Sequence, residues 1–280
     1  MRILLIMMLL PLLAACASIE RLALPTPEPL PGQTLVQFQA PPGQRVDHRR
    51  WNAFLSRYVA PDAQGVNRVA YSQVTQSDQM ALDTYLADLQ AVDPTQLTRE
   101  QQLAFWINLY NAKTVRVVLD NYPVESIRDI KTGPLSVGPW NQPLLTVQGQ
   151  ALSLNDVEHR IIRPTFNEPR IHYALNCAAV GCPNLMDRAW QADTLERDFA
   201  AAERAYVNDP RGVRFDDRGR LTLSKIYIWF REDFGPNEQA VITGIAQAAN
   251  PDLQARLEQT ARVSGYDYDW TLNDGVPGGS

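Results

Sequence analysis

The chain has 280 residues, of which 45% are hydrophobic and 20% are charged, and its formal net charge is -5. This length and composition are those of a globular protein with a sizeable core. The acidic balance and the lack of any run of Lys or Arg exclude nucleic acid as an expected partner.

The N-terminus carries a short apolar segment, residues 3–13, which follows a single Arg and contains Pro11. The segment is too short to span a bilayer and is typical of an export signal. It ends in Leu-Ala-Ala-Cys, whose last residue is Cys16, and this resembles a bacterial lipoprotein signal. The resemblance implies cleavage before Cys16 and attachment of diacylglycerol and palmitate to it. Because Ala17 follows, it also implies an outer-membrane anchor facing the periplasm. The alternative is an ordinary secretory leader with an incidental cysteine.

Six prolines and no helical period mark the segment after Cys16. Such a segment is extended and semi-rigid, so we expect a tether. The predicted organisation is therefore a signal peptide at 1–15, a Pro-rich tether at 16–45 and a single globular domain at 46–280.

Helical periodicity dominates the first half of the domain. Apolar residues spaced i, i+3, i+4, i+7 predict helices over 51–58, with Asp47 as the cap, and over 82–89. A third helix follows from Thr98 and Gln101, which form a capping box, and it continues to residue 120. It is apolar nearly all round, so we expect it to be central and buried.

The second half mixes short strands and helices. The fold class is therefore α+β, with a helical N-terminal half around the central helix and a small antiparallel sheet in the second half. The predicted elements are a hairpin at 144–152, a helix at 153–162 ended by Pro164, a strand at 171–175, a helix at 194–206, a hairpin at 213–223, two helices starting at Asn237 and Asn250, and an extended tail at 265–273.

The predicted strand at 171–175 carries the first candidate site. Alternate residues share a strand face, so His172 and Asn176 are neighbours over the small Ala174. Cys177 follows where the strand ends, and it reaches His172 only through a turn or bulge at Asn176. The pair is then either a nucleophile with its base, or a buried thiol beside a hydrogen-bonded core histidine.

Glu158 and His159 are the second candidates. Adjacent residues of an α-helix point about 100° apart, so the two cannot share a face, and we expect His159 at the surface. Glu158 lies on an apolar side and needs a partner, for which His172, Arg163 and Arg170 are the candidates.

Asn108 and Asn111 lie one turn apart in the otherwise apolar third helix. A buried amide must form hydrogen bonds. The two amides either bridge this helix to later segments or orient groups of a binding site above them.

Metal ligation is the weakest of these hypotheses. The three histidines, Glu158, Cys177 and Cys182 supply enough ligands for zinc, but no spacing matches a closed site. We therefore expect no metal and no other cofactor.

Several longer motifs, which together cover roughly residues 95–235, resemble DUF547, a domain family of unknown function. The order of a polar-bearing central helix and a histidine-bearing strand is also similar to papain- and transglutaminase-type folds. In those folds the nucleophilic cysteine lies on the central helix, whereas residues 99–120 here contain no Cys. The motifs in this range are 105–112, 122–124, 127–130, 153–164, 170–178, 182–183, 223–226 and 233–234, and the tail at 268–273 looks similar too.

The sequence leads to two main hypotheses, and whether the protein is an enzyme stays open. In the first, an envelope lipoprotein with a His172-centred pocket acts on amide or ester bonds. Cys177 is the nucleophile and His172 the base, oriented by Glu158 or Asn176, while Asn108, Asn111, His159 and Arg170 line the binding site.

In the second hypothesis the protein is a non-catalytic envelope binding or scaffold protein with a structural Cys177–Cys182 disulfide. Its partner is an unknown envelope ligand or protein. A weaker third hypothesis, a redox protein, is disfavoured because these cysteines lack the Cys-x-x-Cys spacing.

Overall fold

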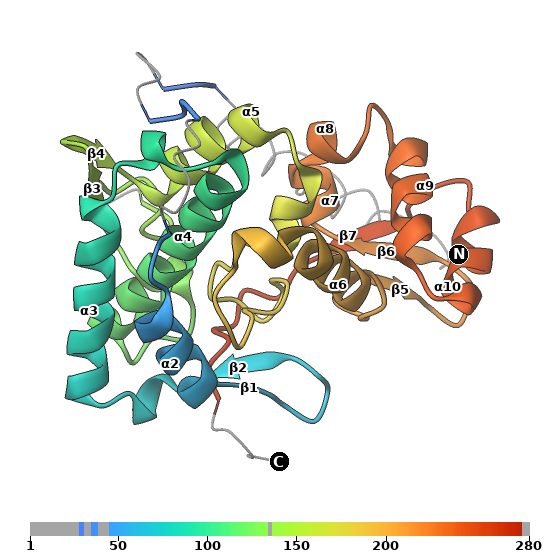
Figure 1. Ribbon diagram of the computed structural model, residues 1–280. Coiled ribbons are helices and arrows are strands. Elements are labelled where there is room, and N and C mark those ends of the chain that lie inside the picture. Colours follow the sequence, from blue (N-terminus) through green and yellow to red (C-terminus); the bar gives the residue numbers. More distant parts are fainter. Residues whose placement is uncertain (1–27, 31–34, 39–44, 134–135, 276–280) are drawn as a thin grey trace. The chain divides into compact units, whose positions relative to one another are not determined.

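The computed structural model describes residues 28–30, 35–38, 45–133 and 136–275 (Figure 1). The predicted signal peptide, Cys16 and most of the tether lie outside the described residues. The described residues divide into two compact units: a larger unit of those from 28 to 202 and from 269 to 275, and a smaller unit of residues 203–268. The tether boundary at residues 45/46 and the single globular domain stay predictions.

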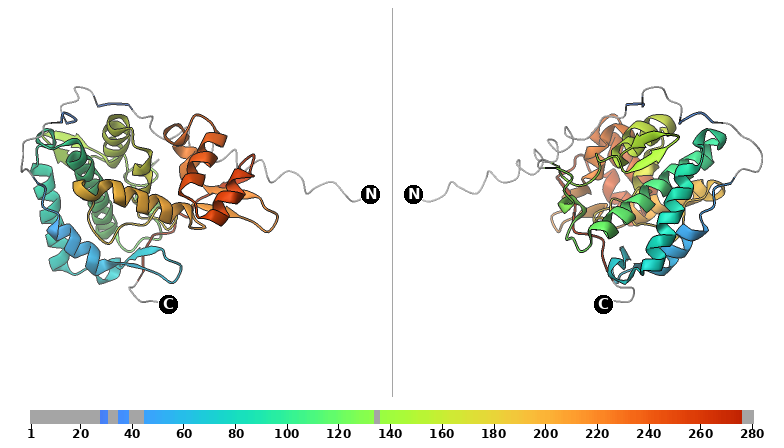
Figure 2. Two further views of the ribbon diagram at one scale, coloured as in Figure 1. Left: turned by 45° about the vertical axis from the view of Figure 1, so that its right-hand side comes forward. Right: turned by 90° about the vertical axis from the view of Figure 1, so that its left-hand side faces the viewer.

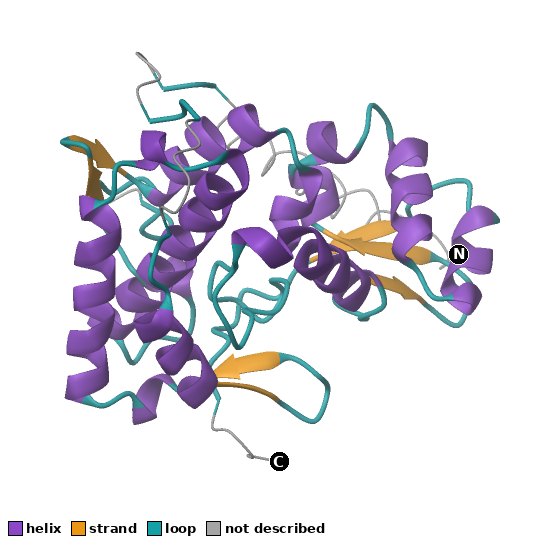
Figure 3. Ribbon diagram, viewed as in Figure 1, coloured by secondary structure: helices purple, strands orange, loops and turns teal. Residues whose placement is uncertain are grey.

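The predicted α+β class is confirmed, because helices and short sheets both occur in the described chain (Figure 3). No helix among the described residues is long and apolar enough to cross a membrane. The likeness to papain- and transglutaminase-type folds finds no support, because His172 lies in a 3-10 helix rather than on a strand.

Three helices build the core of the larger unit: α2 (Arg49–Tyr58), α3 (Gln76–Ala91) and α4 (Arg99–Asn121). All three were predicted, and α3 packs along α4 (Figures 1 and 2). The capping box of Thr98 and Gln101 is present, and α4 is buried on nearly every side. The predicted central helix is thus confirmed.

The start of α2 differs from the prediction. Its N-cap is His48, whose side chain makes no capping hydrogen bond, while Asp47 accepts a bond from the Arg49 N–H at 2.9 Å. Asp47 therefore lies one residue before the cap position that the pattern assigned to it.

Two small antiparallel hairpins flank these helices. The hairpin of β3 (Leu145–Val147) and β4 (Gln150–Leu152) was predicted, whereas that of β1 (Val59–Pro61) and β2 (Asn67–Val69) was not. Strands of three residues carry too little alternation to be recognised on their own; the two-residue turn at Gln148 and Gly149 marks β3–β4, whereas a longer loop joins β1 to β2. Short 3-10 turns connect the elements: η1 (Tyr71–Gln73), η2 (Pro94–Gln96), η3 (Ile127–Asp129) and η6 (Ala192–Thr194).

The segment after β4 forms a π-helix, η4 (Asp156–Ile162), followed by α5 (Arg163–Phe166). A helix was predicted here, and Ser153 and Asp156 do cap it: the Asp156 N–H donates to Ser153 Oγ at 3.0 Å. The predicted stop at Pro164 was wrong, because Pro164 occupies the first turn of α5, where its missing N–H costs nothing.

The predicted strand at 171–175 was also wrong. The chain there is a 3-10 helix, η5 (Pro169–Tyr173), with Pro in its first turn. The Glu168 side chain caps it by accepting the Arg170 N–H at 3.1 Å. The alternation of apolar and polar residues was therefore not that of a strand.

The helix α6 (Leu195–Val207) begins in the larger unit and ends in the smaller one. The smaller unit contains a three-stranded sheet in the order β5-β6-β7 (Figure 3). The predicted hairpin is β5 with β6, but the tail strand β7 pairs parallel to β6, so the sheet is mixed rather than antiparallel. Its elements are β5 (Val213–Phe215), β6 (Leu221–Ser224), α7 (Ile226–Trp229), α8 (Arg231–Phe234), α9 (Glu238–Ala248), α10 (Pro251–Glu258) and β7 (Gly265–Asp267).

The described parts of the predicted tether lie on the larger unit. Leu30 and Leu35 are buried, at 8% and 2% exposure. The Phe38 ring packs 5.8 Å from that of Phe166, and the Gln37 carbonyl accepts a hydrogen bond from Gln102 Nε2 at 3.1 Å. The described residues 28–30 and 35–38 thus contribute to the folded body instead of standing free of it.

Candidate functional site

A buried cluster of one carboxylate, two imidazoles and one guanidinium lies in the larger unit. Glu158 Oε1 is 3.9 Å from His172 Nδ1 and 4.0 Å from His159 Nδ1. Arg163 Nη1 lies 3.3 Å from His159 Nδ1. All four residues are at most 8% exposed. The predicted pairing of Glu158 with His172 is found, at a distance of electrostatic contact rather than of a short hydrogen bond.

The π-helix explains why Glu158 and His159 join the same cluster. A π-helix fits more residues into each turn than an α-helix, so adjacent side chains diverge by less than the ~100° on which the prediction relied. His159 is 2% exposed, so the expected surface position was wrong. The stretch of η4 thereby brings a carboxylate and an imidazole to the segment that carries His172.

The two cysteines that follow η5 form a disulfide, Cys177–Cys182, with Cα atoms 6.4 Å apart. Cys182 is buried and Cys177 half-buried. The Asn176 side chain closes the base of this loop: its Nδ2 donates to Pro183 O at 2.8 Å and its Oδ1 accepts the Ala178 N–H at 2.9 Å. Asn176 is therefore a brace of the loop.

Ala178, inside the loop, has a φ of 61°. This is the left-handed region, which a residue with a Cβ adopts only at a cost. The disulfide and the Asn176 bridge together hold that conformation.

Asn108 and Asn111 bridge α4 to the segments that follow. Asn111 donates to Ala174 O at 2.9 Å and accepts the Asn176 N–H at 2.8 Å. Asn108 does the same to one residue, donating to Trp190 O at 2.8 Å and accepting its N–H at 3.0 Å. Each side-chain amide bonds both a backbone carbonyl and a backbone N–H of a later segment. This supports the interpretation that the two residues bridge α4 to those segments.

Arg170 lies outside the Glu158 cluster. Its guanidinium bonds the carboxylates of Glu168 and Glu196, at 2.7 Å and 2.6 Å. These two partners raise the pKa of Arg170 above its usual range. The guanidinium also stacks over the Phe199 ring, 5.3 Å from its centroid. The expectation that Arg170 pairs with Glu158 finds no support here.

Asn273, in the tail, was missed as part of this region. It is 1% exposed; its Nδ2 lies 3.4 Å from Asn176 Oδ1, and its Oδ1 accepts the Tyr71 hydroxyl at 3.0 Å. The signal that could have found it is a lone amide in an otherwise aromatic tail.

Glu158, His159 and His172 thus form one buried cluster, whereas Asn176 and Cys177 belong to the disulfide-closed loop that follows η5. The described part of the chain contains no group of three or more His, Cys, Asp or Glu placed to hold a metal ion. The His172 side chain is 1% exposed, so it has almost no surface to offer a ligand. The His172-centred pocket stays a prediction.

Fold and site define an α+β protein that contains a buried carboxylate–imidazole cluster and, directly after η5, a disulfide-closed loop. Residues 94–207 match the model of the family described as "Protein of unknown function, DUF547". The match includes α4, both histidines of the cluster and both cysteines of the disulfide. Neither curated proteins nor solved structures give a match to this chain.

Proposed function

We propose that the protein is a lipid-anchored binding or scaffold protein of the bacterial envelope, in which the two cysteines serve the fold rather than catalysis. The observation that carries the proposal is the Cys177–Cys182 disulfide. A disulfide sulfur is not a thiolate nucleophile. Disulfides also persist in oxidising compartments such as the periplasm, which agrees with the export signal expected at the N-terminus.

The proposed anchor is a lipidated Cys16 in the outer membrane, with the body facing the periplasm. Leu30 is buried in the larger unit. The tether between Cys16 and the folded body is therefore shorter than the whole Pro-rich segment. The chain between Cys16 and Leu30 reaches at most about 50 Å when fully extended. The larger unit would thus stay close to the membrane, where its partner is an envelope ligand or protein.

Thiol hydrolysis or transfer on amide or ester bonds is the second candidate. One observation favours it: Glu158 Oε1 lies 3.9 Å from His172 Nδ1, close enough for a carboxylate to stabilise a protonated histidine base but longer than the hydrogen bond that orients one. This mechanism requires the disulfide to be reduced first, so that Cys177 regains a thiolate.

The experiment has two arms on protein expressed with its signal intact and isolated without reductant. In the first, cells are fed an alkyne-labelled palmitate; we expect label on the wild type and none on Cys16→Ser. In the second, the denatured protein is alkylated and weighed; we expect no alkylation at Cys177 or Cys182. Unlabelled wild type would refute the anchor, and rapid alkylation of both cysteines would move the proposal to the thiol enzyme.

A further inference from the structure

A surface cleft of about 350 Å³ opens at the start of α2, away from the Glu158 cluster. It lies wholly in the larger unit, between the first turns of α2 and α4 and the turn η6. Its volume falls in the range of small-molecule sites. The residues that line it are Arg45, Val46, Asp47, His48, Arg49, Asn52, Gln101, Ala104, Gln191, Ala192 and Asp193.

His48 is the buried polar group of this cleft. The residue is 6% exposed, and its Nδ1 is 2.7 Å from the Tyr85 hydroxyl. Its other ring nitrogen has no hydrogen-bond partner among the described residues. Burial lowers the pKa of His48 to about 4, so the ring is neutral at pH 7. A neutral imidazole fixed at one nitrogen leaves the other for a ligand atom.

Arg45 supplies the positive charge at one end of the cleft. It lies just before α2, and within the described chain its guanidinium has no ion-pair partner. The start of α2 adds no further free charge, because the Asp47 carboxylate accepts the Arg49 N–H at 2.9 Å and pairs with the Arg49 guanidinium at 2.7 Å.

The opposite charge comes from η6. Asp193 is exposed and lines the cleft, and it too has no ion-pair partner within the described chain. The lining thus balances Arg45 and Arg49 against Asp47 and Asp193, with no formal net charge. A balanced lining disfavours dianionic phosphates and favours a ligand that carries one charge of each sign.

We propose that this cleft binds a zwitterion of the amino-acid type, a free amino acid or a short peptide. The carboxylate lies at Arg45, the ammonium at Asp193, and the backbone atoms between them at His48 and Asn52. Asn52 already uses its Oδ1 to accept the Ala189 N–H at 2.7 Å, so its side-chain N–H₂ is the group left for a ligand. The inference rests on the proposed binding role and names its ligand class.

The test is calorimetric titration of the full-length protein with L-alanyl-L-alanine. Two capped analogues serve as probes, N-acetyl-L-alanyl-L-alanine without the ammonium and L-alanyl-L-alaninamide without the carboxylate. We expect saturable binding of the dipeptide with a dissociation constant of about 1 mM or tighter, and roughly tenfold weaker binding of each capped analogue.

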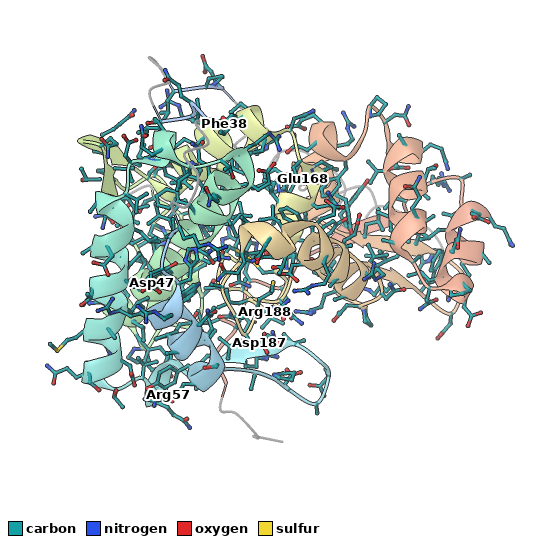
Figure 4. The ribbon with its side chains drawn as sticks, viewed as in Figure 1. Phe38, Asp47, Arg57, Glu168, Asp187 and Arg188 are labelled. Atoms are coloured by element: carbon teal, nitrogen blue, oxygen red, sulfur yellow. A yellow bond between two sulfur atoms is a disulfide. The ribbon has the colours of Figure 1, made fainter. Side chains whose placement is uncertain are left out.

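Two charge variants test which residue holds the carboxylate of the dipeptide and which holds its ammonium group. Arg45→Gln should weaken the dipeptide about tenfold and leave the amide unchanged, whereas Asp193→Asn should weaken the dipeptide and leave the acetylated analogue unchanged. Matched controls remove the same charges outside the cleft: Arg50→Gln, whose guanidinium pairs with Asp88, and Asp187→Asn, which pairs with Arg188 (Figure 4). Both controls should bind like the wild type.

Equal binding of capped and free dipeptides, or equal losses in the control variants, would overturn the zwitterion site. So would the absence of saturable binding up to about 10 mM. These outcomes are independent of palmitate labelling and of cysteine alkylation, so a failed cleft and a failed anchor or disulfide can be told apart.

Discussion

The larger unit contains two polar regions of opposite character. Around His172, the carboxylate, imidazoles and guanidinium face one another and are buried. Around His48, the imidazole has one partner, and two charges of opposite sign have none within the described chain. Polar groups that satisfy one another stabilise a fold, whereas polar groups that face an open cleft are available to a ligand. The region around His172 therefore has the character of a structural cluster, and the proposed binding belongs to the region around His48.

We expect the largest loss of stability from a variant that removes the bridge between α4 and the segment that carries His172. Asn111→Ala leaves the Ala174 carbonyl and the Asn176 N–H buried without a partner, at a cost of about 3–4 kcal/mol. Denaturant unfolding measures this loss. Asn121→Ala is the control, because its amide bonds one carbonyl at the half-buried end of the same helix, and it should cost less than about 1 kcal/mol. Equal losses would contradict the structural assignment.

The second largest loss of stability should occur in acid, and it should come from His48 in the cleft. Its folded pKa of about 4 lies below the ordinary 6.5, because burial disfavours the charged ring more than Asp47 favours it. Between pH 6.5 and 4 the unfolded chain therefore binds a proton at His48 that the native state does not bind. The free energy of unfolding falls as the pH drops through this range. The expected loss is about 3 kcal/mol. Urea unfolding across this range measures it, and His48→Gln should flatten the slope; an unchanged slope would contradict the burial of His48.

Reduction of the disulfide should cause the third largest loss of stability. The bond closes a short loop, for which the chain-entropy relation gives about 2 kcal/mol. Thermal unfolding with and without reductant measures the change, and Cys177→Ser with Cys182→Ser should abolish the response to reductant. Stability that is insensitive to reductant would argue that the cysteines do not brace the loop.

The smallest expected effect is a gain in stability. Ala178→Gly removes the Cβ from a left-handed residue with φ 61°, so it should stabilise the protein by up to about 1 kcal/mol. Ala179→Gly, in the same loop but without positive φ, is the matched control and should destabilise. If both variants lose stability alike, the loop is not strained at Ala178.

The sequence predicted what local patterns control. The capping box and the apolar surface of α4 were sufficient for the central helix, and the two-residue turn at Gln148 and Gly149 was sufficient for the β3–β4 hairpin. These features depend on residues a few positions apart.

The candidate site depended on tertiary contacts that no local pattern contains. The 171–175 segment looked like a strand, but Pro169, the Glu168 cap and the Asn111 bridge hold η5 as a 3-10 helix. Likewise, the α-helical angle separated Glu158 from His159, and only the π-helix brings them together. The cleft was missed because its lining comes from the starts of α2 and α4 and from η6, which no local sequence pattern brings together.

The most direct test of the comparison uses the fact that the chain has only three histidines, His48, His159 and His172. Their imidazole nitrogens can be followed together by NMR while L-alanyl-L-alanine is added to the full-length protein. The account predicts that the His48 signals shift saturably and that those of His159 and His172 stay in place. Shifts at His172 or His159 with an unmoved His48 would contradict it and return the binding site to the buried cluster.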